Sequence, residues 1–170
     1  MIVSSDLTWT ANTEYITKKS FGRLWILRRL KQIGAKENDL IDIYIKQVRT
    51  ILEFATPVWS SSITKIESKQ IERVQKCALS IILGLKYKSY KQALEYTNLE
   101  NLNDRRDKIV FKFASKSVKH NKYKQWFQIN NQVRNTRTET LKFLPVKANR
   151  GKLLNSPIAH MTKMLNFSNC

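Results

Sequence analysis

The sequence has few of the residues that build disulfides, metal sites or phosphate-binding loops. Its two cysteines (Cys77, Cys170) and two histidines (His120, His160) form neither a disulfide framework nor a zinc-ligand spacing. Its four glycines form no Gly-x-x-x-x-Gly-Lys loop and no Gly-x-Ser-x-Gly motif. The composition therefore predicts no metal ion and no cofactor, and it suits a reducing, intracellular compartment, cytoplasmic or nuclear.

Acidic side chains are scarce as well. The chain has 13 acidic residues against 31 Lys and Arg, which gives a net charge of +18. The excess grows along the chain, because residues 121–170 carry nine basic side chains and only one acid, Glu139. A phosphate backbone is the commonest partner of such a chain, and an anionic membrane surface is the next.

Long apolar runs are missing too. No run reaches the length of about 18 residues that a transmembrane helix needs, and no secretion signal opens the chain. Acids scattered over the first helices also argue against binding to an anionic membrane. We therefore expect a protein that neither spans nor binds membranes.

Helical periodicity dominates what is present and predicts an all-α fold, a single bundle of about five helices. Gly34 and Gly84 are expected to end helices, and Thr64 with Glu67 forms a capping box. Ile82 is expected to be buried. The helices are predicted over residues 12–32, 39–55, 64–83, 89–96 and 102–118, the last burying Leu102, Ile109, Phe113 and Val110.

The helical pattern also divides the chain. Residues 1–10 are expected to be a truncated extended segment, and residues 11–127 the helical domain. Residues 128–152, rich in Asn, Thr and cations, are predicted to be a loop or a disordered basic linker. Residues 153–170 form a tail in which Ser156-Pro157 opens a short helix.

Paired aspartates, which polymerases use to hold two metal ions, are absent. Asp39 and Asp42 lie near a helix start, where the helix dipole favours acids. His120 has no neighbouring carboxylate to orient it. The chain is therefore not expected to be an enzyme as it stands.

Basic residues interleaved with aromatic ones provide the candidate nucleic-acid contacts. Lysines beside Tyr87 and Tyr90 suit a phosphate at a helix start, or they are solvated while both tyrosines pack inward. Arg105 and Arg106 oppose the helix dipole, so Asp104 and Asp107 are expected to compensate them. The candidates are Arg23, Arg28 and Arg29 on the first helix, Lys86, Lys88 and Lys91 in the middle, and Lys116, Lys119, Lys122 and Lys124 beside Tyr123 and Trp126.

Several stretches taken together resemble one known family. They are Asp6-Leu7-Thr8-Trp9, Leu27-Arg28-Arg29-Leu30, Leu52-Glu53-Phe54-Ala55-Thr56-Pro57-Val58-Trp59, Gln70-Ile71-Glu72-Arg73-Val74-Gln75-Lys76-Cys77-Ala78, Ile81-Ile82-Leu83-Gly84 and Leu99-Glu100-Asn101-Leu102-Asn103-Asp104-Arg105-Arg106. In this order, residues 1–127 resemble the C-terminal, post-polymerase region of jockey-like non-LTR retrotransposon reverse transcriptases.

The resemblance implies a thumb-like helical region that grips template and primer, without the catalytic aspartates of the parent RNA-directed DNA polymerase. It predicts a non-catalytic fragment that retains sequence-independent RNA or DNA binding. An alternative is a helical protein-interaction module, which binds another reverse transcriptase copy through exposed Trp9, Trp25 or Trp59. A decayed copy with no present function is a further alternative.

Overall fold

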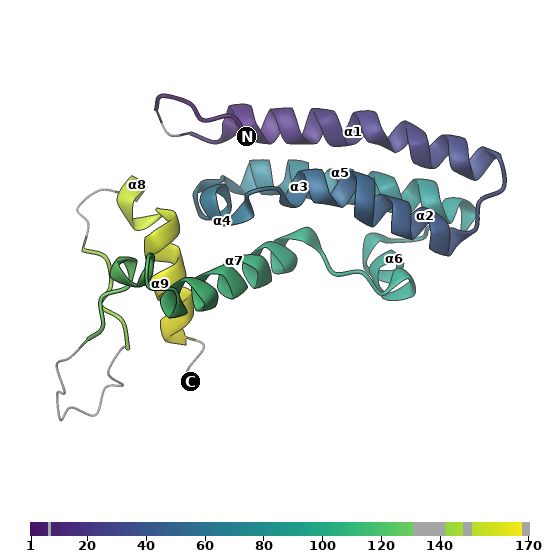
Figure 1. Cartoon of the computed structure of the whole chain (residues 1–170). Helices are drawn as coiled ribbons and strands as arrows, with labels where there is room; N and C mark the ends of the chain where they lie inside the picture. The colour runs from purple at the N-terminus through teal and green to yellow at the C-terminus, as the bar shows by residue number, and fades with distance from the viewer. Residues whose placement is uncertain (7, 131–141, 148–150, 168–170) are drawn as a thin grey trace. The chain divides into compact units, whose positions relative to one another are not determined.

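The structure, a computed structural model, describes residues 1–6, 8–130, 142–147 and 151–167. These residues form helices and one isolated antiparallel bridge between Ile129 and Phe143, and no strand, so the predicted all-α fold is confirmed (Figure 1). The chain divides into two compact units. Unit 1 comprises Met1–Ala55 and Ile63–Arg105, and unit 2 comprises Thr56–Ser62 and Arg106–Cys170.

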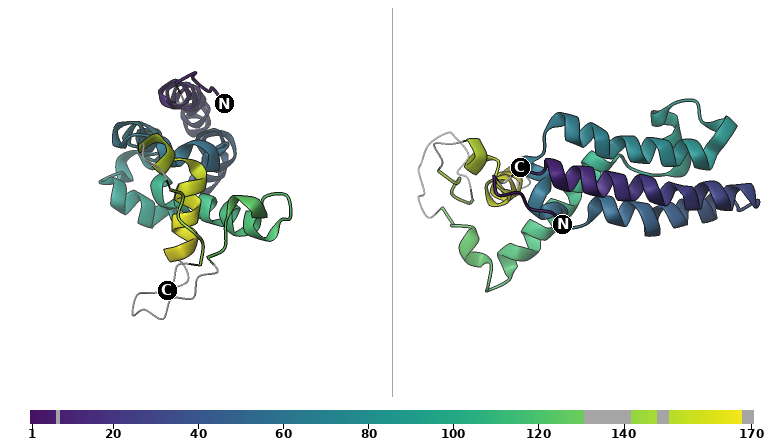
Figure 2. Two further views of the ribbon diagram at one scale, coloured as in Figure 1. Left: turned by 90° about the vertical axis from the view of Figure 1, so that its left-hand side faces the viewer. Right: turned by 90° about the horizontal axis from the view of Figure 1, so that it is seen from above.

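Unit 1 is built from three long rods and a short helix. One rod is α1 (Thr10–Gln32), and the second joins α2 (Glu37–Ile43), the π-helix η1 (Tyr44–Arg49) and α3 (Thr50–Glu53). The third is α5 (Lys65–Leu83), followed by η3 (Gly84–Lys86) and α6 (Tyr90–Thr97). The helix α1 packs along both other rods (Figure 2).

The three rods share an apolar core. The fully buried side chains come from all of them, so each rod shields the others from water. Exposed positions of α1 therefore lie on the side away from α5. The core includes Leu24, Leu27, Leu40, Tyr44, Val48, Leu52, Ile71, Leu79 and Ile82.

Local signals set the ends of α5 as predicted. The Thr64 hydroxyl accepts from the Glu67 backbone N–H at 3.2 Å, and the Glu67 carboxylate accepts from the Thr64 N–H at 2.7 Å. At the other end Gly84 has a φ of +55°, which an L side chain rarely adopts. Both ends of this helix are thus dictated by sequence signals within four residues.

The helix predicted over residues 39–55 differs from the structure. It starts at Glu37, contains the six-residue π-helix η1 and ends at Glu53. The chain turns at Phe54 and at Ala55, whose φ is +54°. Pro57 lies in the first turn of the next helix, α4 (Thr56–Trp59), where a missing N–H costs no helical hydrogen bond.

A buried polar network ties unit 1 together around Gln75, which is fully buried. The Tyr44 hydroxyl donates to the Gln75 amide oxygen at 2.5 Å. The Gln75 amide nitrogen donates to the Tyr90 hydroxyl at 3.1 Å and to the Glu100 carbonyl at 2.8 Å. The Glu72 carboxylate accepts from the Tyr90 hydroxyl and from the backbone N–H of Leu102. Burial raises the pKa of both tyrosines, so they are neutral donors.

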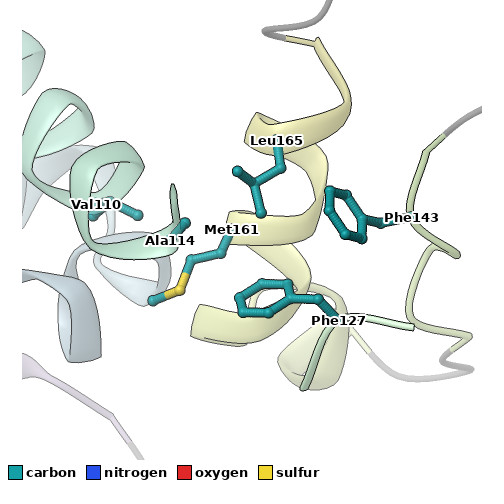
Figure 3. Packing of buried hydrophobic residues seen from close by; sticks show 6 residues of the cluster. All are labelled: Val110, Ala114, Phe127, Phe143, Met161 and Leu165. Atoms are coloured by element: carbon teal, nitrogen blue, oxygen red, sulfur yellow. The ribbon is translucent and has the colours of Figure 1, made fainter. Parts of the chain in front are cut away.

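Unit 2 is built from α4, η2 (Ser60–Ser62), most of α7 (Leu102–Lys119), η4 (Lys124–Trp126), α8 (Gly151–Leu154) and α9 (Pro157–Phe167). Both α4 and η2 contact α9. A small apolar core joins α7 to α9 and to two phenylalanines outside the helices (Figure 3). It consists of Val110, Ala114, Phe127, Phe143, Met161 and Leu165.

The buried side of α7 differs from the prediction. Leu102 and Val110 are buried as expected, but Ala114 is buried where the prediction had Ile109 and Phe113. Ile109 is half-buried, and Phe113 is 39% exposed. The reason is that the buried stripe follows steps of four residues from Leu102, which turns both predicted side chains away from the core.

The segment predicted as a linker contributes to unit 2. Phe143 is buried, and its ring centroid lies 6.1 Å from that of Phe127. Backbone hydrogen bonds also join residues 142–144 to residues 128–130. The predicted boundary after residue 127 therefore falls inside unit 2. The disorder predicted at 131–141 and 148–150 lies outside the described residues.

The two chain ends contain the other predicted segments. The predicted C-terminal helix is α9, whose Ser156 hydroxyl accepts from the Ala159 N–H at 3.4 Å. In the predicted extended segment, residues 1–3 pair with no strand of the described chain. Instead the Ile2 N–H donates to the Asn12 side-chain oxygen at 3.1 Å.

The packing of α5 predicts the effect of truncating Ile82, whose side chain is 0% exposed. We expect Ile82→Ala to lower the free energy of unfolding by about 2–5 kcal/mol, because it leaves a cavity in the core of unit 1. Urea denaturation followed by circular dichroism measures the change. Ile66→Ala, on the same helix at a 70% exposed position, is the control and should change stability little. Equal effects of both variants would show that α5 is not packed in a core.

Candidate nucleic-acid interface

The outer face of α1 carries cations and aromatic rings together. Its exposed residues are Tyr15, Lys18, Lys19, Phe21, Arg23, Trp25, Arg28 and Arg29. Of these, Trp25 is 60% exposed, the most open of the four tryptophans. The helix has one acid, Glu14. Positions three and four apart share a helical face, so each exposed ring has a cation within one turn.

No carboxylate neutralises these cations. Among the described residues, none of Lys18, Lys19, Arg23, Arg28 and Arg29 forms an ion pair. Two of them contact neutral groups on the same helix. The Lys19 ammonium lies 5.6 Å from the Tyr15 ring centroid, and Arg29 approaches the Gln32 amide oxygen at 3.5 Å. The donors of this face are thus available to a phosphate backbone.

Lys31, a further cation of the first helix, has a structural role instead. Its ammonium donates to the carbonyl oxygens of Ile81 and Ile82 at 2.6 and 2.9 Å. These carbonyls belong to the last turn of α5, where no helical N–H reaches them and a positive charge is favoured. Lys31 therefore caps α5 and does not belong to the outer face of α1.

Of the three lysines predicted as contacts in the middle of the chain, Lys86, Lys88 and Lys91, the first forms an ion pair within the fold. Lys86 donates to the Glu37 carboxylate at 2.7 Å, and this hydrogen bond holds the pKa of Glu37 below its usual range. Lys88 and Lys91 are exposed, and neither forms an ion pair within the described chain. Tyr90 is committed to the buried network, which favours the inward packing of this ring over base stacking.

The basic strip at the end of α7 is exposed along its whole length. Lys116, Lys119, Lys122 and Lys124 all face solvent in unit 2. Beside them three rings follow each other, and we call His120, Tyr123 and Trp126 the aromatic ladder. The ring centroids of His120 and Tyr123 are 5.0 Å apart, and those of Tyr123 and Trp126 are 4.8 Å apart. The Lys122 ammonium lies 6.0 Å from the Tyr123 centroid.

The two arginines at the start of α7 are held within the fold. Arg105 donates to both oxygens of Glu53, at 2.5 and 3.1 Å, and this pairing raises the pKa of Arg105. Asp104 hydrogen-bonds Asn101, so the pairing partner of Arg105 is Glu53 and not the expected Asp104. Glu53 is 52 residues away in sequence, which is why the local pattern did not reveal it. Arg106 is buried.

The three tryptophans that were predicted to be exposed for protein docking differ in their burial. Trp9 and Trp59 are buried, so only Trp25 of the three is available as an exposed apolar anchor. In the described part of the chain, no helix is long and apolar enough to cross a membrane. In the same residues, no group of three or more His, Cys, Asp or Glu side chains comes together to hold a metal ion.

No protein-family model, curated protein or solved structure matches the chain. Each unit therefore carries its own candidate surface, defined by its geometry: the outer face of α1 in unit 1, and the basic strip with the aromatic ladder in unit 2.

The two hydrogen bonds of Lys31 predict that its charge stabilises the fold. We expect Lys31→Met, which keeps most of the stem, to lower the free energy of unfolding by about 1–3 kcal/mol, because the α5 carbonyls lose a charged donor. Thermal and urea denaturation measure this change. Lys19→Met removes an exposed charge from the same helix and should alter stability by less than about 0.5 kcal/mol. A Lys31 variant as stable as the Lys19 variant would contradict the capping role.

Proposed function

We propose that this chain binds RNA or DNA through the phosphate backbone, without sequence preference. The observation that carries the proposal is the outer face of α1, where five exposed cations without ion pairs stand among three exposed aromatic rings. Cations that meet phosphates release counterions, which supplies most of the free energy of nonspecific binding. The rings add contact area that does not depend on base identity.

The resemblance of residues 1–127 to the post-polymerase region of non-LTR retrotransposon reverse transcriptases supports the same proposal. It suggests a non-catalytic fragment whose retained capacity is to hold a template and primer. In this proposal the cations of α1, together with Lys88, Lys91 and the α7 strip, contact phosphates.

A second candidate is protein docking through the same face of α1. It is favoured by Trp25, whose large exposed ring is the kind of anchor that protein interfaces bury. Its partner would be another reverse transcriptase copy or another protein with an apolar groove. Salt separates the two candidates, because apolar docking depends little on ionic strength.

Salt dependence therefore tests the proposed function. If about six cations meet phosphates, log K should fall with log salt at a slope near −4 for single strands and near −5 for duplex. Fluorescence anisotropy with labelled oligonucleotides of mixed and of uniform sequence measures both the slope and the lack of sequence preference. A slope near zero would favour the protein partner.

The contribution of α1 has its own test. Replacing Arg23, Arg28 and Arg29 together with Gln should reduce the single-strand slope by about 2, since three phosphate contacts are lost. The control removes the same charge from exposed positions of α5, by replacing Lys65, Lys69 and Arg73 with Gln. Equal losses in both triple variants would indicate a diffuse effect of net charge and not a contact face on α1.

Catalysis is tested separately. With a primer–template, nucleotides and Mg²⁺, we expect no primer extension above a no-protein control, because the sequence contains no Asp-Asp pair to hold the metal ions. The measurement is a gel assay of primer extension on protein purified to homogeneity. Extension that copurifies with the chain would refute the proposal of a non-catalytic fragment.

A further inference from the structure

The aromatic ladder is aligned by the backbone that follows α7. The N–H of Tyr123 donates to the carbonyl of His120, and the N–H of Trp126 donates to the carbonyl of Tyr123, both at 3.0 Å. Bonds of this i to i+3 kind give three residues per turn, so every third side chain lies in line. The spacing of the three rings in the sequence thus becomes a continuous row, with neighbouring planes tilted by 32° and 42°.

A buried neighbour fixes the row in place. Phe127, the residue after Trp126, is 3% exposed and packs in the core of unit 2 (Figure 3). Trp126 itself is 37% exposed and His120 is exposed, so both ends of the row reach solvent. Ring centroids about 5 Å apart leave no room for another ring between them. Any further ring stacks on the two ends.

The surroundings of the ladder are positive. No acidic residue lies in the sequence between Asp107 and Glu139, and lysines 116, 119, 122 and 124 are exposed in the same stretch. Trp126 also forms one wall of a cleft of about 880 Å³. Its other walls are apolar at Ile129, Leu144, Pro145 and Val146, which suits the face of a base. They are polar at Gln125, Gln128, Asn130 and Lys147, whose amides and ammonium suit the polar edges and phosphates of nucleotides.

We propose that the aromatic ladder binds unpaired bases, which makes single-stranded RNA or DNA the preferred form of the ligand. A base stacks on the open end of the row at Trp126 while the lysines hold the adjoining phosphates. Paired bases in a duplex are already stacked and cannot reach these rings. This inference rests on the proposed function and adds strand selectivity to it through unit 2.

The test separates bases from phosphates. The full chain is titrated with three labelled probes of equal length: oligo(dT), an abasic strand of the same backbone, and a duplex. We expect oligo(dT) to bind roughly 5- to 150-fold more tightly than the abasic strand, as base–aromatic stacking contributes this much per base. The comparison uses the unaltered protein, so it does not depend on how any variant folds.

Variants then assign the preference to the ladder. Trp126→Ala and Tyr123→Ala should each lower the affinity for oligo(dT) and leave the affinities for the abasic strand and the duplex unchanged, whereas the rings of α1 keep their own contribution. Trp126→Phe keeps a ring and should retain most of the preference. Phe113→Ala is the matched control, because Phe113 is a similarly exposed aromatic residue of the same unit outside the ladder.

Each other outcome has a definite meaning. Equal affinity for oligo(dT) and the abasic strand, with a steep salt slope, would overturn the ladder inference and leave the proposed function intact. A base preference that both alanine variants leave undiminished would also overturn it. Binding to none of the three probes would overturn the inference and the proposed function together.

Discussion

The hydrogen bonds of one buried amide hold unit 1 in register. Gln75 lies in the middle of α5 without access to water, so its oxygen and nitrogen must find partners inside the fold. Tyr44, Tyr90 and the Glu100 carbonyl supply them from three other segments. An apolar core tolerates small slides between helices, whereas an unmet amide costs about 1–3 kcal/mol. These hydrogen bonds fix the position of α5 against η1, α6 and the segment before α7, and α1 packs along the rods that they hold together.

Signals confined to a few residues could be predicted from the sequence. The capping box of Thr64 and Glu67 and the turn at Gly84 are local, and they appear in the structure where the pattern indicates them. Interactions between distant residues could not be predicted. Lys31 caps a helix end 50 residues away, and Phe143 enters a core from a segment that reads as polar loop. The sequence around Lys31 is that of an ordinary basic helix, and Phe143 lies in a short apolar stretch of a polar segment. Neither pattern identifies the distant partner, because these contacts form only in the tertiary structure.

In the candidate nucleic-acid interface, too, local features could be predicted and contacts between distant residues could not. Arg23, Arg28 and Arg29 were expected as contacts because they are cations of the first helix, and all three are exposed in the structure. The ion pair that engages Lys86 comes from Glu37, 49 residues earlier, and no spacing rule indicates it. The row formed by Tyr123 and Trp126 required a period of three, while the helical pattern before it has a period near 3.6. The aromatic residues are evident in the sequence, but their alignment depends on the change from an α-helix to turns with three residues per turn.

The chain enters unit 2 at Thr56, returns to unit 1 at Ile63 and enters unit 2 again at Arg106. Neither unit is therefore a contiguous piece of the polypeptide, and no single cleavage releases either one whole. During synthesis α4 leaves the ribosome long before α9, the helix that it contacts, has been made. The α4 segment, with its tryptophan, must wait for about 100 residues of further translation, and contacts of such sequence separation are the slow ones to form. For this interval the nascent chain carries an apolar segment that a chaperone would recognise.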